Sequence, residues 1–196
     1  MKGQVASNGS GCIISGKRIL TNAHVVSNIT FLQVKKYGDT KKYVAYVDVV
    51  DHDCDLAILK VKDDEFFNGV KPLKIGKTPF LGDTVKVYGY PLGGDELSIT
   101  KGVVSRVELG TYAHSFRSFL YIQIDAAINE GNSGGPVIMN NKIVGVAFQS
   151  FKSAENIGYA VAPPIIKHFL NDLKAVSYTH LRAHETSLHL VCRLLL

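Results

Sequence analysis

Short strands separated by turn residues fill most of the chain, and this alternation restricts the possible folds more than any other feature. Between Gly11 and Ala162, segments rich in β-branched and aromatic residues alternate with clusters of Gly, Asn and Asp. Such spacing is typical of a β-sandwich or barrel. The predicted strands are 12–15, 18–21, 31–35, 43–50, 56–61, 84–88, 97–107, 119–125, 136–139, 142–148 and 157–161. The segment 63–77 interrupts the pattern, so we expect it to connect two β lobes.

One helix is predicted, near the end of this region. Pro163 or Pro164 suits the first helical position, and an apolar face follows at helical spacing: Ile165, Ile166, Phe169, Leu170 and Leu173. With 196 residues, 46% of them hydrophobic, the chain can form one large domain or two small lobes. We therefore predict an all-β, two-lobed domain that ends in an α-helix.

Composition argues against several functional classes. No apolar run is long enough to span a membrane, and no apolar signal region begins the chain. The net charge is +5, and the basic pairs Lys35-Lys36 and Lys41-Lys42 lack a nucleic-acid-binding motif around them. Three cysteines without pair spacing form neither a disulfide framework nor a zinc site. We expect no nucleic acid or membrane partner, no metal and no cofactor.

The last residues change in character from Val176 onward. The stretch VSYTHLRAHET resembles the in-frame translation of a sequencing-library adapter, so we expect 176–196 to be an artefactual tail. The alternatives are a genuine C-terminal helix or a metal-binding cluster of His180, His184 and His189. The predicted domain is therefore 1–175.

Three glycines surround one serine in the run INEGNSGGPV, which spans 128–137. Glycine loses much conformational freedom on folding, so such a cluster indicates unusual dihedrals or a close approach to the backbone. A tight turn explains it, and so does a nucleophile beside its oxyanion hole. A catalytic Ser133 would need a base within reach, a group that orients the base, and donors for the oxyanion.

Four histidines precede the tail: His24, His52, His114 and His168. His24 follows a predicted strand, and Asp55 begins the buried-looking strand 56–61, where a carboxylate can fix an imidazole tautomer. The pattern Gly-x-Ser-x-Gly also fits the nucleophile elbow of α/β-hydrolases, but that elbow needs a helix after the serine, and a strand is predicted there. The order His24, Asp55, Ser133 is that of the chymotrypsin type.

The acidic segment 51–55 suggests two further sites. Asp51, Asp53 and Asp55 fit the first three ligand positions of an EF-hand loop, but Leu56 and Lys62 stand where that loop needs glycine and glutamate. Calcium binding is therefore rejected. Cys54 could act as a nucleophile, but the role of a small buried hydrophobic residue explains it better.

Several of these motifs together resemble the Deg/HtrA (protease Do-like) serine proteases, closest to the plant-type branch. They are TNAHVV, DCDLAIL, GDTVKVYGYPLGG, QIDAAINEGNSGGPV and NIGYAV, and the resemblance covers about 10–174. It implies a chymotrypsin-like double β-barrel, with lobes at about 1–75 and 78–175. It also implies that His24 and Asp55 lie in the first barrel and Ser133 in the second.

The resemblance further implies the roles of individual residues. Gly131, Asn132 and Ser133 would form the oxyanion hole, with the N–H groups of Gly131 and Ser133 as donors. Asn132 occupies the place where digestive proteases carry an aspartate that pairs with a newly cut N-terminus, so we predict no activation by such cleavage. A pocket favouring small or medium aliphatic side chains would be walled by Ile128, Asn129, Phe148, Gln149, Ser150 and Gly158.

The function implied is an ATP-independent serine endopeptidase that acts on unfolded or damaged polypeptides. The alternative is a catalytically silent module that only binds peptides. Family members usually carry PDZ domains, and we expect none within these residues; many members form trimers through a segment upstream of GSGCII. The resemblance leaves open whether the full-length protein is a trimer and whether the first barrel has all its strands. Plastid, mitochondrial and nuclear members exist.

Overall fold

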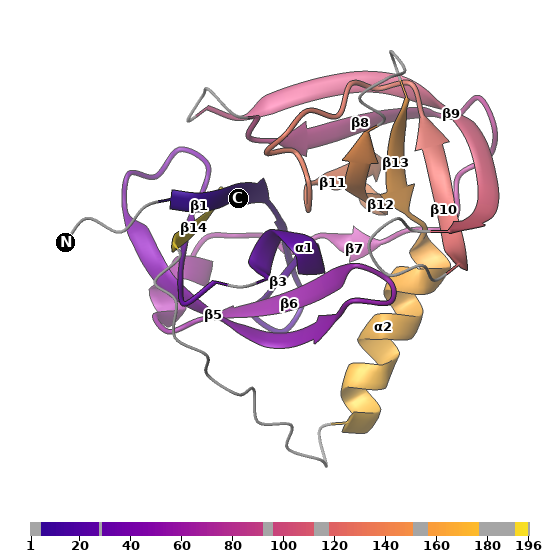
Figure 1. Ribbon diagram of the computed structural model, residues 1–196. Coiled ribbons are helices and arrows are strands. Elements are labelled where there is room, and N and C mark those ends of the chain that lie inside the picture. Colours follow the sequence, from indigo (N-terminus) through magenta and orange to yellow (C-terminus); the bar gives the residue numbers. More distant parts are fainter. Residues whose placement is uncertain are drawn as a thin grey trace.

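The computed structural model describes residues 5–27, 29–91, 96–111, 118–150, 157–176 and 191–195. It contains two seven-stranded sheets, which form separate lobes, and a helix near the C-terminal end (Figure 1). The predicted all-β, two-lobed architecture with a C-terminal helix is confirmed.

The first lobe has the strand order β1-β14-β4-β5-β6-β3-β2. Its apolar side chains point into a core that includes Ile19, Val34, Leu59 and Phe66. The elements in chain order are β1 (Val5–Ser10), β2 (Cys12–Ile14), β3 (Arg18–Thr21), α1 (Ala23–Val26), β4 (Phe31–Lys35), β5 (Lys42–Asp51) and β6 (Leu56–Val61). The sequence predicted these strands to within two residues, except β1, which it missed.

A strand from the tail completes this sheet. β14 (Val191–Leu195) pairs in parallel with β1 on one side and with β4 on the other. From the sequence we expected this segment to lie outside the folded domain. A short run of apolar residues can take this position because the facing edges of β1 and β4 both present backbone groups that need partners.

The connection between the lobes contains more structure than the sequence indicated. A short 3₁₀ helix, η1 (Asp64–Phe67), is capped by the Asp63 carboxylate, which accepts from the Glu65 N–H. The N–H of Leu73 then donates to Ile13 O in the first lobe, at 2.9 Å. Strand β7 (Lys74–Ile75) follows and pairs with β12 (Lys142–Ser150) of the second lobe. The connection is thus hydrogen-bonded to both lobes.

The second lobe has the order β11-β8-β9-β10-β13-β12-β7, with β11 also pairing with β12. This extra pairing joins β11, at one end of the order, to β12, which lies next to the other end. Its own core includes Val85, Ile122, Ile124 and Val137. Its remaining strands are β8 (Thr84–Gly89), β9 (Ser98–Thr111), β10 (Ser118–Ile124), β11 (Pro136–Met139), β12 (Lys142–Ser150) and β13 (Gly158–Val161).

Helix α2 (Pro163–Val176) begins at one of the two predicted prolines. Ile166 and Phe169 on its apolar face join a third core cluster, which also holds Leu56 from the first lobe and Phe148 from the second. This cluster packs the two lobes and the helix together. Among the described helices, none is long and apolar enough to cross a membrane.

Candidate active site

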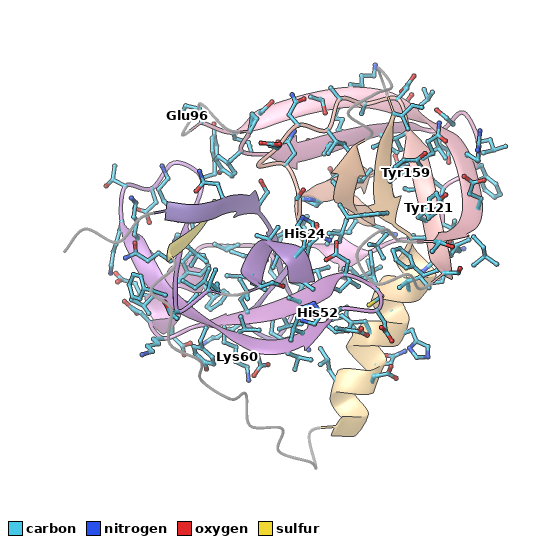
Figure 2. All side chains as sticks on the ribbon, in the orientation of Figure 1. His24, His52, Lys60, Glu96, Tyr121 and Tyr159 are labelled. Carbon is cyan, nitrogen blue, oxygen red and sulfur yellow. The ribbon has the colours of Figure 1, made fainter. Side chains whose placement is uncertain are left out.

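His24 lies on α1, a single helical turn that directly follows β3. Figure 2 shows it where the two lobes meet. Ala23, Val25 and Val26 are buried in the first lobe, whereas the His24 side chain keeps 30% of its surface exposed. The packing of its neighbours therefore presents the imidazole at the junction.

Asp55 holds His24 through two hydrogen bonds. Its Oδ1 accepts from the His24 backbone N–H at 2.9 Å, and its Oδ2 lies 2.7 Å from His24 Nδ1. Asp55 is 1% exposed, so water competes little for these bonds. A carboxylate at Nδ1 favours the tautomer with its proton there, which leaves the lone pair of Nε2 able to accept a proton. The predicted pairing of His24 with Asp55 is present in the structure.

The backbone around Asp55 explains how the carboxylate reaches His24. Asp55 has φ +56°, a left-handed conformation that aspartate adopts more readily than most residues. Its carbonyl oxygen accepts from Asn22 Nδ2 at 2.8 Å, and both groups are buried. In the preceding turn, Asp51 Oδ1 accepts from the Asp53 N–H at 2.8 Å. Among the described residues, no group of three His, Cys, Asp or Glu side chains could hold a metal ion.

The Ser133 loop has the unusual dihedrals that its glycines suggested. Gly131 has φ +95° and Gly134 has φ +84°. Within the loop, the Asn132 N–H donates to Asn129 O and the Gly135 N–H to Asn132 O, each at 2.9 Å. Neither the Gly131 nor the Ser133 N–H donates to another described residue. These are the two groups expected to bind an oxyanion.

The loop also touches the first lobe beside His24. Ser133 O accepts from the Ser10 N–H at 2.8 Å. A Cβ on Gly134 would collide with Ser10 O and Thr21 Oγ1 and would lie 3.2 Å from the Asn22 N, so only glycine allows this approach. The Ser133 hydroxyl makes no hydrogen bond to another described residue. Such catalytic hydrogen bonds often tighten only when substrate binds.

The other candidate residues lie elsewhere. His52 is exposed in the 51–55 turn, and His168 is exposed on α2, where it pairs with Asp172 at 2.8 Å. His114 lies outside the described residues. Burial, assisted by the charge of Asp51, raises the pKa of the Cys54 thiol, so little reactive thiolate forms. A thiol mechanism through Cys54 is therefore disfavoured.

The predicted pocket walls are partly core residues. Ile128 is 6% exposed and packs so closely on Gly158 that a Cβ there would lie 2.6 Å from Ile128 Cδ1. Phe148 is also 6% exposed, and the centroid of its ring lies 5.6 Å from that of Phe119. Asn129 is exposed, and the Gln149 and Ser150 side chains lie outside the described part of the chain. The specificity pocket stays a prediction.

Sequence reasoning missed three buried polar residues at this junction: Ser10, Thr21 and Asn22. Each bonds to a residue distant in sequence, as with Ser10 and Gly131, which are 121 positions apart. The only signal available was their place beside the motifs, Asn22 within TNAHVV and Ser10 next to GCII.

Two β lobes with a His–Asp pair and a glycine-rich serine loop at their junction define a trypsin-like peptidase. The family model of the trypsin-like peptidase domain matches residues 9–146. The fold agrees with the crystal structure of the Rv3671c protease from M. tuberculosis in its active form. That likeness has a TM-score of 0.73 at 26% identity and covers 89% of this chain and 76% of that one.

Curated relatives narrow the family further. The chain is 58% identical over 167 residues to Protease Do-like 4, mitochondrial, of Arabidopsis thaliana, covering 85% of this chain and 32% of the relative. It is 51% identical over 172 residues to Protease Do-like 2, chloroplastic, of the same plant, covering 86% and 28%. The chain therefore belongs to the protease Do-like (Deg/HtrA) family of trypsin-like serine proteases, in its plant-type branch. It spans about a third of the length of these relatives.

Proposed function

We propose that this chain is the catalytic domain of a serine endopeptidase that cleaves unfolded or damaged polypeptides without ATP. The observation that carries the proposal is the buried Asp55 carboxylate bonded twice to His24, at 2.9 and 2.7 Å, beside a loop that presents Ser133. The names of the curated relatives and the fold both support a protease.

In the proposed mechanism, Ser133 Oγ attacks the scissile carbonyl carbon while His24 Nε2 takes the hydroxyl proton. The Gly131 and Ser133 N–H groups stabilise the negative oxygen of the tetrahedral intermediate. His24 then gives its proton to the leaving amine, and the peptide C–N bond breaks. A water molecule, deprotonated by His24, attacks the resulting acyl ester, which releases the second product and restores the Ser133 hydroxyl. Asp55 keeps His24 oriented throughout.

A fluorophosphonate probe tests the proposal directly. It should label Ser133, and unfolded casein should be cleaved without ATP. Ser133→Ala should abolish labelling and lower kcat by at least about 10⁴-fold. Ser105→Ala is the matched control, because Ser105 is exposed on β9.

The same experiment separates a second function. A silent peptide-binding module has one observation in its favour, which is that the Ser133 hydroxyl bonds to no other described residue. If unfolded protein binds the wild-type chain but no serine is labelled, this second function replaces the first. Labelling that persists in Ser133→Ala would contradict the proposed nucleophile.

We extend the proposal to location and to domain limits. Relatives named mitochondrial and chloroplastic support an organelle address, which fractionation of cells with an antibody to the domain would test. We take the protease domain as 1–175 with its lobes at about 1–75 and 78–175. A chain truncated after Ala175 should keep the labelling rate of the full chain, and loss of labelling would show that 176–196 belongs to the domain.

A further inference from the structure

Ser10, the last residue of β1, uses every one of its polar groups at the junction of the two lobes. It is 1% exposed. Its Oγ donates to Gly131 O at 2.7 Å and accepts from the Tyr90 N–H at 2.8 Å. Its N–H donates to Ser133 O, and its carbonyl oxygen accepts from Thr21 Oγ1, both at 2.8 Å. Three of these four bonds reach the second lobe.

The two loop carbonyls that Ser10 binds lie on either side of the nucleophile. Gly131 O belongs to the peptide group before Asn132, and Ser133 O to the peptide group before Gly134. Fixing both planes restricts the backbone between them, which carries the Ser133 N–H. Because a peptide group is planar, the rotations that remain free are those about the Cα atoms.

Gly131 is the residue that most needs this restraint. It has φ +95°, and glycine moves readily between left- and right-handed conformations. A rotation at Gly131 would turn its N–H away from the position where the oxyanion forms. The bond from Ser10 Oγ to Gly131 O opposes that rotation from the other side of the same residue.

The Ser10 hydroxyl also connects the loop to β8. Its oxygen accepts from the N–H of Tyr90, which directly follows β8 and is 3% exposed. The preceding Gly89 lies against the loop, since a Cβ on it would be 3.0 Å from Asn132 Cα. Without the hydroxyl, both Gly131 O and the Tyr90 N–H would lose a partner in a buried place, which is costly.

We infer that Ser10 is a positioning residue that holds the oxyanion loop of the second lobe in its productive shape from the first lobe. It touches no substrate and acts through Gly131 and Ser133. The inference rests on the proposed function, because an oxyanion hole matters only if Ser133 forms a tetrahedral intermediate.

The test compares Ser10→Ala with Ser27→Ala in the full chain. Ser27 is a matched control because its hydroxyl also donates to a backbone carbonyl, Ala23 O, at 2.7 Å, but it does not touch the loop. Ser10→Ala should lower kcat about 10- to 100-fold with KM changed less than about threefold, since removal of one donor outright costs about 10²–10³. Ser27→Ala should change kcat less than about twofold.

A transition-state analogue separates positioning from general structural damage. A peptide boronic acid places an oxygen in the oxyanion hole once Ser133 adds to boron, whereas the product peptide that begins with the new amine does not use the hole. Boronate affinity should therefore fall in Ser10→Ala by about the same factor as kcat, with product affinity unchanged. Ser10→Cys, which keeps a weaker donor of similar size, should lie between serine and alanine, and it serves as the test if the alanine variant does not fold.

Three results would overturn the inference. An unchanged kcat in folded Ser10→Ala would show that the loop holds its shape alone. An equal loss of boronate and product affinity would indicate a structural role only. A wild-type chain that neither cleaves nor labels would remove the proposed function and this inference together, which distinguishes the two failures.

Discussion

The two lobes prepare their parts of the site by different kinds of contact. In the first lobe, His24 and Asp55 meet through a side-chain hydrogen bond, and Asn22 supports Asp55 from the same lobe. In the second lobe, the Ser133 loop is shaped by backbone bonds, and one of its carbonyls is held by the Ser10 N–H from the other lobe. The acid–base pair is therefore complete within one lobe, whereas the geometry of the nucleophile depends on the junction.

The first-lobe pair should show the largest effect. In Asp55→Asn, an amide group facing His24 Nδ1 favours the tautomer with its proton on Nε2, where it cannot accept from Ser133. We expect kcat to fall about 10⁴-fold while the fold is kept. Peptide cleavage measures this, with Asp53→Asn in the same turn as control. A decrease below tenfold would show that Asp55 does not set the tautomer.

The junction should show the next largest effect, and two glycines of nearly equal φ isolate it. Gly134 has φ +84° and backbone atoms of the first lobe against it, whereas Gly82 has φ +83° and no atom within 4 Å of the place that a Cβ would take. Gly82→Ala should cost about 1–2 kcal/mol of unfolding free energy for its φ alone. Gly134→Ala should cost about 1–3 kcal/mol more from crowding and should slow fluorophosphonate labelling.

Urea unfolding of both variants gives the comparison. Equal losses of unfolding free energy with equal labelling rates would mean that the junction accommodates a methyl group at Gly134. The geometry of the nucleophile would then not depend on the junction.

Asn132 tests whether the second-lobe loop tolerates charge. It is 2% exposed, and its Oδ1 has no hydrogen-bond partner among the described residues. Asn132→Asp would bury a carboxylate there, so we expect a loss of about 2–3 kcal/mol in urea unfolding at neutral pH. Asn129→Asp, at an exposed position of the same loop, should change stability little. A gain of activity in Asn132→Asp after trimming of the N-terminus would contradict our prediction that such cleavage plays no role.

The core between the lobes should show the smallest effect, through pH. Burial raises the pKa of the Cys12 thiol to about 12, whereas a thiol in the unfolded chain has a pKa of about 8.5. Because the pKa is higher in the folded state, the unfolded chain loses its thiol proton first as the pH rises. The free energy of unfolding is therefore unaffected below about pH 8.5 and falls as the pH rises from there towards 12. From pH 8 to 9.5 we expect Cys12 to account for a loss of about 1 kcal/mol.

Cys12→Ala supplies the comparison for this pH dependence. The variant should start from a lower stability because of the space it leaves, but its unfolding free energy should fall less steeply over the same pH range. Parallel slopes for the two chains would show that the thiol is accessible to water in the folded protein.

The sequence predicted most strands, because segments rich in β-branched residues can be recognised locally. It also predicted the His24–Asp55 pair, because the order of His24, Asp55 and Ser133 can be read directly from the chain. It missed β1, whose sequence VASNGS has little β-propensity and which pairs with β14, a strand distant in the sequence. It missed Ser10 and Asn22 for a related reason. Ser10 bonds to Gly131 and Asn22 bonds to Asp55, and the residues next to Ser10 and Asn22 in the sequence do not indicate these partners.

Much of what places the nucleophile loop against the first lobe involves main-chain atoms or the absence of a side chain at Gly134. Such contacts make almost no demand on the identity of exposed residues in the predicted pocket wall, such as Asn129. Descendants of this domain can therefore exchange those residues, and with them their preferred cleavage sites, without rebuilding the machinery that cuts.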